Sequence, residues 1–172
     1  MKLAALVLCL SLAGLAVGGG CASDPSRGYS FSSSYDDRVQ SISVSVFENA
    51  TFHPGLEADL AHAVIRRVQR DTPWRVLEPS TAQTTLTGEI VEVQINRITQ
   101  DIDGGISQQV AVRLRTNFVW RSSVTGRVLA ERRGLAVTET FIPAAGEPIE
   151  LGLTAATDEM ADAILEAMRS VW

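Results

Sequence analysis

The strongest constraint on the fold is a segment in which apolar and polar residues alternate. The apolar residues are Val110, Val112, Leu114, Phe118 and Trp120, and the positions between them include Arg113, Arg115 and Asn117. This period of two predicts a β-strand with one buried face and one exposed face. Because an isolated hairpin is only marginally stable in water, the strand needs further strands beside it and a second layer against its apolar face.

Two further segments are predicted to flank this strand. Residues 85–98 are rich in β-branched side chains, and their apolar positions change parity after Ile90, which predicts a bulge or twist there. The sequence D-I-D-G-G at residues 101–105 predicts a hairpin loop. S-V-T-G-R at residues 123–127 predicts a turn into a last strand from Val128 to about Phe141. The three strands together form a meander.

The rest of the chain predicts two more strands and two helices. The strands are expected where serines alternate with Ile42, Val44 and Val46, and at the apolar run from Trp74 to Leu77. The first helix follows Pro54, which suits an initial helical position, and its apolar stripe is Leu56, Leu60, Ala63, Val64 and Val68. The second helix carries Met160, Ala163, Ile164, Ala167, Met168 and Val171. A helical crossover places the first two strands parallel.

These elements predict an α+β fold. We expect a two-layer α/β sandwich in which a mostly antiparallel mixed sheet carries two helices packed on one face, in the order β-α-β-β-β-α. Residues 39–172 are predicted to form this single domain, because 172 residues with 45% hydrophobic content suit one ordinary globular core.

The N-terminal residues are predicted to direct export. Lys2 precedes an uncharged apolar run from Leu3 to Val17, and three glycines separate that run from Cys21. Residues 1–20 are therefore interpreted as a signal peptide, since the run is shorter than the roughly 20 residues of a membrane span. Residues 21–38 are rich in Ser, Gly, Pro and Asp and are interpreted as a flexible tether.

Cys21 occupies the position that a bacterial lipoprotein acylates, although Gly18 stands where such signals usually have Leu. Cys21 is therefore the predicted lipid attachment site, and the tether is predicted to be lipidated. The alternative is ordinary cleavage near Gly20, which leaves a free thiol. Because Ala22 and Ser23 do not resemble an inner-membrane retention signal, we expect a lipid-anchored protein on the periplasmic face of the outer membrane.

The composition argues against several classes of function. A net charge of -5 disfavours nucleic-acid binding. Two histidines and two cysteines are too few for a zinc site, and neither His53 nor His62 accompanies a nucleophile motif. His62 is interpreted as a partly buried structural residue. We therefore expect no catalytic residue, no metal, no cofactor and no enzymatic activity.

Basic residues are concentrated in the meander. Between Arg97 and Arg133 the chain has seven arginines against three carboxylates, a local charge of +4. In a two-layer sandwich one face of the sheet has no helix over it, and arginine on that face suits phosphate recognition. An anionic lipid head group is thus a candidate ligand. The alternative is that these arginines only solvate an exposed strand face.

Several motifs in the mature chain resemble the LptE family of lipopolysaccharide-assembly lipoproteins. The most specific are F-E-N-x-T-x-x-P-G-L-E at residues 47–57 and L-T-G-E-I at residues 86–90. The resemblance implies an outer-membrane lipoprotein that plugs the β-barrel LptD and helps to assemble lipopolysaccharide. Lipopolysaccharide is then the expected ligand of Arg97, Arg113, Arg115 and Arg121, and an LptD-like barrel is the expected partner.

A second kind of periplasmic lipoprotein remains as an alternative. A strand that ends in F-E-N and leads into a helix also resembles lipoprotein domains that activate cell-wall synthases or assemble secretion pores. Such a domain binds a protein partner through one exposed patch and carries no lipid cargo. The basic sheet favours the lipopolysaccharide interpretation over this alternative.

Overall fold

The computed structural model describes residues 38–102, 105–143 and 149–169. Its elements are β1 (Ser41–Val44), β2 (Glu48–Asn49), α2 (Leu56–Asp71), β3 (Arg75–Val76), β4 (Thr84–Ile102), β5 (Gly105–Ser122), β6 (Val128–Phe141) and α3 (Glu150–Arg169). The strands form one sheet in the order β3-β1-β4-β5-β6, and the short β2 also pairs with β4. The predicted signal peptide and nearly all of the predicted tether lie outside the described residues.

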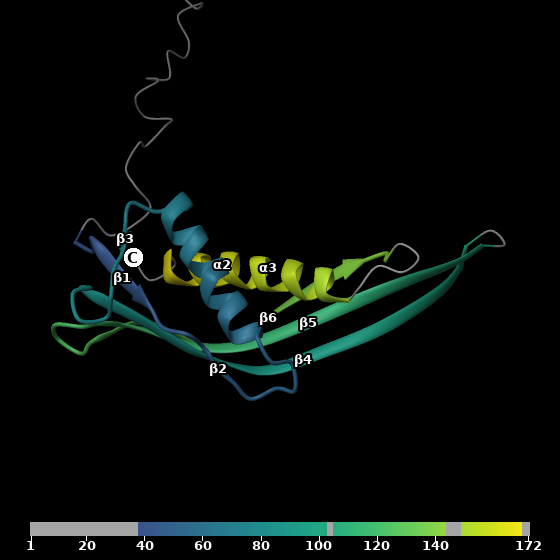
Figure 1. The fold of residues 1–172 in the computed structure, drawn as a ribbon, viewed down its shortest axis with the longest axis horizontal. Coiled ribbons are helices and arrows are strands. Elements are labelled where there is room, and N and C mark those ends of the chain that lie inside the picture. The colour runs from purple at the N-terminus through teal and green to yellow at the C-terminus, as the bar shows by residue number, and fades with distance from the viewer. Residues whose placement is uncertain (1–37, 103–104, 144–148, 170–172) are drawn as a thin grey trace, which may run out of the picture. The chain divides into compact units, whose positions relative to one another are not determined.

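The sheet is mixed, as predicted. β1 is parallel to β3 and β4, and β2 is parallel to β4. The meander β4-β5-β6 is antiparallel. Both helices lie on the same side of the sheet (Figure 1), which confirms the α+β two-layer arrangement. The observed order along the chain is β-β-α-β-β-β-β-α, which has two strands more than the expected β-α-β-β-β-α.

The core lies between the sheet and the two helices. Leu86, Val112 and Leu114 of the sheet and Leu60 and Ile164 of the helices are almost fully buried in one cluster. At one end of the core, the rings of Trp74 and Trp120 are 5.1 Å apart between centroids. Burial of these apolar side chains is the main stabilising contribution to the fold.

Ion pairs connect the two helices at the solvent side. Arg66 of α2 lies 2.8 Å from Asp158 of α3, and Arg67 forms an ion pair with Asp162. Burial, followed by the nearby Asp71 carboxylate, raises the pKa of Asp162. Exposed pairs of this kind contribute at most about 1 kcal/mol each, so they orient the helices more than they stabilise them.

The predicted bulge in β4 is present. Its register with β5 shifts between Ile90 and Glu92. Before the shift, Leu86 and Ile90 face the core, whereas after it Val93 and Ile95 lie opposite the buried Leu114 and Val112. One extra residue therefore keeps apolar side chains on the helix side although their sequence parity changes.

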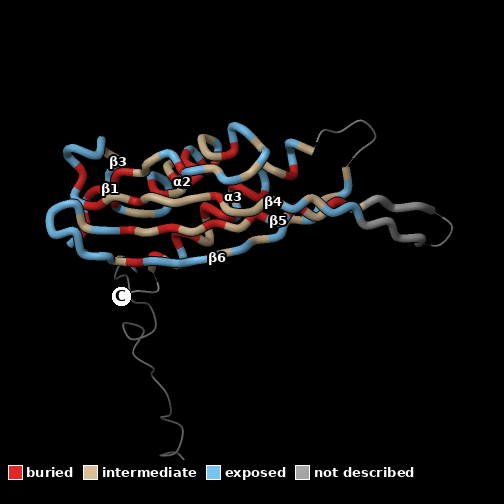
Figure 2. The backbone as a smooth tube through the Cα atoms, turned by 90° about the horizontal axis from the view of Figure 1, so that it is seen from below, coloured by how far each residue is buried: buried red, intermediate tan, exposed pale blue. Residues whose placement is uncertain are grey.

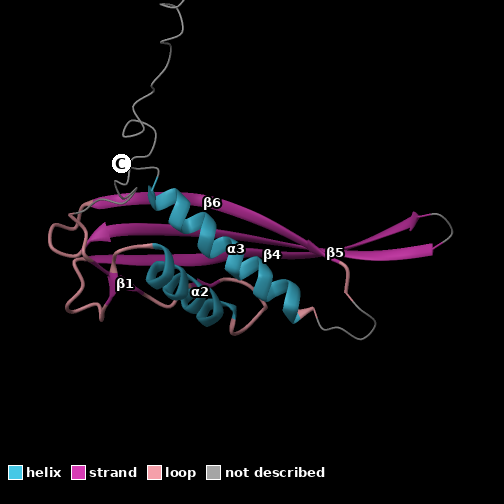
Figure 3. Cartoon of the chain, turned by 90° about the horizontal axis from the view of Figure 1, so that it is seen from above, coloured by secondary structure: helices cyan, strands magenta, loops and turns pink. Residues whose placement is uncertain are grey.

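The β4-β5 hairpin is longer than its neighbours. β4 and β5 pair from Thr84 and Ser122 to Ile102 and Gly105, but β6 pairs with β5 no further along than Val110. The last part of the hairpin is thus two-stranded, and Figure 3 shows it reaching past both helices. The predicted hairpin is present, but its strands pair as far as Ile102 and Gly105, so the connection between them is shorter than the predicted loop at residues 101–105.

β6 forms an exposed edge of the sheet. Most of its residues are exposed (Figure 2). Its register with β5 shifts near Gly134, which has a φ of 66° and donates its backbone N–H to Asn117 Oδ1 at 2.8 Å. Bulges and charged residues protect an edge strand against pairing with other chains.

The helix boundaries differ from the prediction. α2 begins at Leu56, because Gly55 is its N-cap and Pro54 lies outside the helix. α3 begins at Glu150, ten residues before Met160. The sequence did not predict this part of the helix, because its buried positions Gly152, Ala156 and Thr157 form no large apolar stripe. A Cβ at Gly152 would overlap the ring of Phe141, so the missing side chain allows this helix to approach β6.

Three smaller predictions also need correction. Val46 lies beyond the end of β1 and is 64% exposed, so the predicted core alternation stops at Val44. His62 is exposed on α2 and is not partly buried. Val171 of the predicted stripe lies outside the described residues. No helix in the described ranges is both long and apolar enough to cross a membrane.

Candidate functional site

The sheet face opposite the helices is the first candidate site, and we call it the outer face. On β5 it consists of Arg113, Arg115, Asn117, Val119 and Arg121, which alternate with the buried core residues. Residues paired across antiparallel strands share a face, so Gln94 and Thr138 flank Arg113 on this side. The predicted position of Arg113 and Arg115 away from the helices is confirmed.

The three arginines of this face have different surroundings. Arg113 and Arg121 are exposed, and neither has a carboxylate within ion-pair distance in the described part of the chain. Arg115 is 38% exposed at its side chain, and its Nε lies 3.2 Å from Glu92 Oε2. Any anion that binds Arg115 must therefore compete with the Glu92 carboxylate.

Arg97 does not belong to the outer face. It lies opposite Val110 in the β4-β5 register, and Val110 is buried on the helix side. The bulge after Ile90 is the reason, because it exchanges the two faces for all later residues of β4. The expectation that Arg97 joins Arg113 and Arg115 on one face is wrong.

The outer face is less basic than the local sequence indicates. Glu92 pairs with Arg115, and Glu131 lies 2.9 Å from the Nε of Arg133. Glu48 and Glu89 add two carboxylates in direct register at the β2 side. The count over residues 97–133 missed three of these carboxylates, because they lie on neighbouring strands outside that window.

The F-E-N motif region has a structural role that the sequence did not reveal. The side-chain amide of Asn49 donates to the carbonyl of His53 at 2.8 Å and to Glu57 Oε2 at 2.7 Å. Asn49 Oδ1 accepts from the backbone N–H of Thr51 at 2.9 Å and from its hydroxyl at 2.7 Å. Asn49 thereby fixes the loop that joins β2 to the start of α2.

Glu57 completes this network at the helix N-terminus. Its carboxylate also accepts the backbone N–H of Gly55 at 3.1 Å. Hydrogen bonding from its own backbone N–H, then from the Asn49 side chain, lowers the pKa of Glu57 from its ordinary value of 4.5. A carboxylate in the first turn also interacts favourably with the helix dipole.

The two motifs meet in space. The ring of Phe47 occupies the position where a Cβ on Gly88 would lie, and the carbonyl oxygen of Asn117 is 2.7 Å from that position. Phe47 is buried, and Ala50 continues the contact by donating its backbone N–H to the Ile90 carbonyl at 3.0 Å. The glycine of L-T-G-E-I is thus required by the phenylalanine of F-E-N.

The loop built by Asn49 presents one large hydrophobic side chain, Phe52, to solvent. Phe52 lies between Thr51 and His53, both of which take part in the network, and it is 102% exposed. The Thr51 hydroxyl also accepts the backbone N–H of His53 at 3.3 Å. A fully exposed aromatic ring on a hydrogen-bonded loop is a typical anchor for a protein partner.

The two histidines lie on different parts of the fold, the loop after β2 and helix α2. His53 contributes its backbone to the loop network, whereas His62 is on the exposed side of α2. Within residues 38–102, 105–143 and 149–169, no set of three His, Cys, Asp or Glu side chains is placed to hold a metal ion.

Comparison with solved structures supports the fold. A minor lipoprotein from Acinetobacter baumannii is similar, with 13% identity, a TM-score of 0.50, and coverage of 77% of this chain and 94% of that one. PelC from Paraburkholderia phytofirmans, solved as a dodecamer, has 16% identity, a TM-score of 0.42, and coverage of 73% and 88%. At 13% identity the similarity to the Acinetobacter baumannii lipoprotein concerns the fold alone, and the similarity to PelC, with a TM-score below 0.5, carries no argument.

Comparison with family profiles gives the assignment. No curated protein matches the sequence. The profile of the LptE lipopolysaccharide-assembly family matches residues 39–170, which include every element described above. The structure explains the two motifs that carry the resemblance, since Asn49 and Glu57 fix one loop and Phe47 packs on Gly88. The chain belongs to the LptE family of lipopolysaccharide-assembly proteins.

Proposed function

We propose that this protein is an outer-membrane lipoprotein that helps to assemble lipopolysaccharide as plug and partner of an LptD-like β-barrel. The family match over residues 39–170 carries the proposal. The proposed anchor is an acylated Cys21 on the periplasmic face of the outer membrane. Three acyl chains hold a protein far more firmly than one, at about 0.8 kcal/mol per buried methylene.

The outer face is the proposed contact with lipopolysaccharide. Arg113 and Arg115 project from the same face of β5 at a separation of about 7 Å, a spacing that suits two phosphates of one head group. Arg121 lies eight residues from Arg113, about 26 Å along the strand, and therefore contacts a different part of the ligand. Arg97 is left out of this site because it faces the helix side.

The Phe52 loop is the proposed contact with the barrel. Two features support this assignment: the aromatic ring is fully exposed, and the Asn49 network fixes the loop before any partner binds. A preformed loop loses little conformational entropy on binding, so its contact energy is retained.

Co-purification tests the proposal. The full-length lipoprotein is isolated from detergent-solubilised outer membranes, and its partner is identified by mass. We expect Phe52→Ala to lower barrel recovery at least fivefold. Ile142→Ala, which removes another exposed apolar side chain, is the matched control and should leave recovery unchanged.

Depletion distinguishes the two classes of lipoprotein. Loss of a barrel plug lowers the amount of assembled barrel and increases sensitivity to bulky antibiotics. Normal barrel levels together with a cell-wall defect would contradict the proposal and favour an activator of cell-wall synthesis.

A further inference from the structure

A cavity of about 450 Å³ lies at the end of the sheet where β4 begins, β5 ends and β6 begins. Its lining includes Arg38, Val39, Ser122, Thr125, Arg127 and Leu129. This volume is within the range of sites that bind small molecules. The cavity shares no residue with the proposed site on the outer face.

One wall of the cavity is a hydrogen-bonded turn. Ser122 and Arg127 are joined by a backbone hydrogen bond of 2.9 Å, and Gly126 donates its N–H to the Ser122 carbonyl at 2.9 Å. Ser123 ties the turn to the start of β4 by donating its N–H to the Gln83 carbonyl at 2.8 Å. The backbone that carries Arg127 is therefore positioned before a ligand binds.

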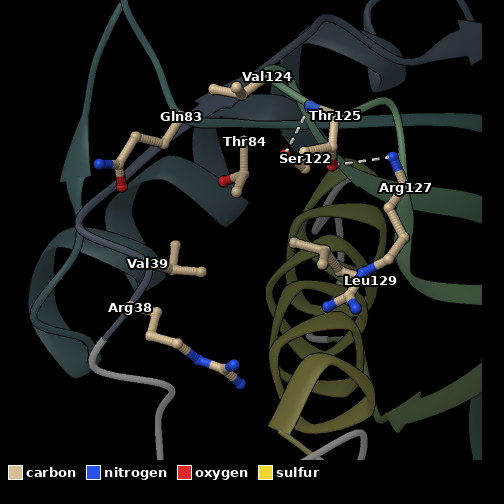
Figure 4. Close-up of a pocket in the computed structure, with 9 residues that line it drawn as sticks. All are labelled: Arg38, Val39, Gln83, Thr84, Ser122, Val124, Thr125, Arg127 and Leu129. Atoms are coloured by element: carbon tan, nitrogen blue, oxygen red, sulfur yellow. Dashed lines mark hydrogen bonds between the residues drawn. The ribbon is translucent and has the colours of Figure 1, made fainter.

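The Ser122 and Thr125 hydroxyls of this wall can each donate a hydrogen bond to a ligand. Ser122 Oγ accepts the backbone N–H of Thr125 at 3.2 Å, and Thr125 Oγ1 accepts the backbone N–H of Arg127 at 3.4 Å. Each hydroxyl keeps its own proton available to donate. Figure 4 shows the Arg38 and Arg127 side chains reaching toward the same opening from opposite walls.

Among the described residues, the lining combines these donors with apolar surface and includes no carboxylate. The Arg127 side chain has no ion pair among the described residues. Val39, Leu129 and Val124, which is 82% exposed, supply the apolar part. A phosphate ester offers several charged acceptor oxygens to such a set of guanidinium and hydroxyl donors.

We propose that this cavity binds a phosphate ester that carries an apolar group, as in the head group of an anionic lipid. The identity of that lipid rests on the proposed function, whereas the preference for an apolar phosphate rests on the cavity alone. The protein would then contact lipid at two separate places, the cavity at the end of the sheet and the outer face.

The test uses the full-length protein and three probes. These are dihexanoyl phosphatidic acid below its micelle concentration, dihexanoyl phosphatidylcholine and inorganic phosphate, each titrated calorimetrically. We expect phosphatidic acid to bind at least tenfold more tightly than either other probe. Equal affinity for inorganic phosphate would overturn the apolar part of the proposal, and equal affinity for phosphatidylcholine would overturn the anionic part.

Substitutions locate the site. Arg127→Ala should weaken binding of phosphatidic acid at least tenfold, and Arg127→Lys should restore part of it. Arg75→Ala is the matched control, because it removes the same charge from an exposed position outside both the cavity and the outer-face site, and it should change affinity less than twofold. Equal losses in the two alanine variants, or none in either, would overturn the proposal.

A lipopolysaccharide arm separates this inference from the proposed function. If wild-type protein binds phosphatidic acid through Arg127 but does not bind lipopolysaccharide, the cavity stands and the proposed function fails. If the wild-type protein binds lipopolysaccharide through Arg113 and Arg115 but Arg127→Ala does not change the affinity for phosphatidic acid, the proposed function is supported and this inference fails.

Discussion

The contact between Phe47 and Gly88 allows a quantitative test of why the two family motifs occur together. The change is Gly88→Ala. The new methyl group would overlap the Phe47 ring and would lie 2.7 Å from the Asn117 carbonyl oxygen, so the ring must move. Phe47 is 2% exposed, and its displacement gives up part of a fully buried aromatic side chain.

The expected magnitude follows from two opposing effects. Overpacking of a core position costs about 1–3 kcal/mol. Replacing glycine by alanine also restricts the unfolded chain, which returns about 0.4–1 kcal/mol. We therefore expect Gly88→Ala to lower the free energy of unfolding by about 1–2 kcal/mol. Phe47→Ala alone should lower it by about 3–5 kcal/mol, because it leaves a cavity.

The assay is a double-mutant cycle measured by urea denaturation. Phe47→Ala removes the ring, so in that background Gly88→Ala should lower the free energy of unfolding by at least about 1 kcal/mol less than it does in the wild type. A coupling of this size lies in the range found for contacting residues, about 0.5–3 kcal/mol. The Asn117 carbonyl retains a residual cost. Additive losses, within about 0.5 kcal/mol, would refute the argument that Gly88 is required by Phe47.

Three further predictions concern other parts of the chain. Cys21→Ser should release the protein from the membrane fraction, and the intact mass of this variant should lack the acyl chains. An unmodified N-terminus in the wild-type protein would contradict this prediction. The double variant Arg113→Ala/Arg115→Ala should weaken lipopolysaccharide binding at least tenfold across a salt series, whereas Glu92→Gln should strengthen binding by freeing Arg115. Arg133→Ala is the control, because it removes a charge already paired with Glu131. Unchanged binding in the double variant would mean that the face is only solvated. The pKa of Glu57 is lowered from its ordinary value of 4.5. The ionised Glu57 carboxylate therefore stabilises the fold above that value, and this stabilisation is lost as the pH falls below it through the folded-state pKa. Glu57→Gln should make the free energy of unfolding depend less on pH in the acid range, and an unchanged pH dependence would refute this.

The sheet was predictable because its signal is local. The alternation from Val110 to Trp120 and the parity change after Ile90 both follow from side chains a few positions apart, and the structure has the expected strand and bulge. The N-terminal half of α3 was not predictable. Its buried positions are Gly152, Ala156 and Thr157, and small residues leave no apolar stripe although they allow close packing on Phe141.

The candidate sites were less predictable because they depend on register. The sequence places a bulge near Ile90 but does not specify how it reassigns Arg97 to the other face. It also does not show that Glu92 lies beside Arg115. The cavity combines residues from three separate segments, which contribute Arg38, Gln83 and Ser122, and no spacing in the sequence brings them together.

The most direct test of the central claim is cross-linking in living cells from position 52. A photoreactive amino acid replaces Phe52 in the full-length, membrane-anchored protein, and the cross-linked product is identified by mass. We predict a product with an outer-membrane β-barrel of the LptD kind, which is absent when the photoreactive group replaces the exposed Ile142. A product with a cell-wall synthase or a secretion-pore subunit, and none with a barrel, would contradict the claim.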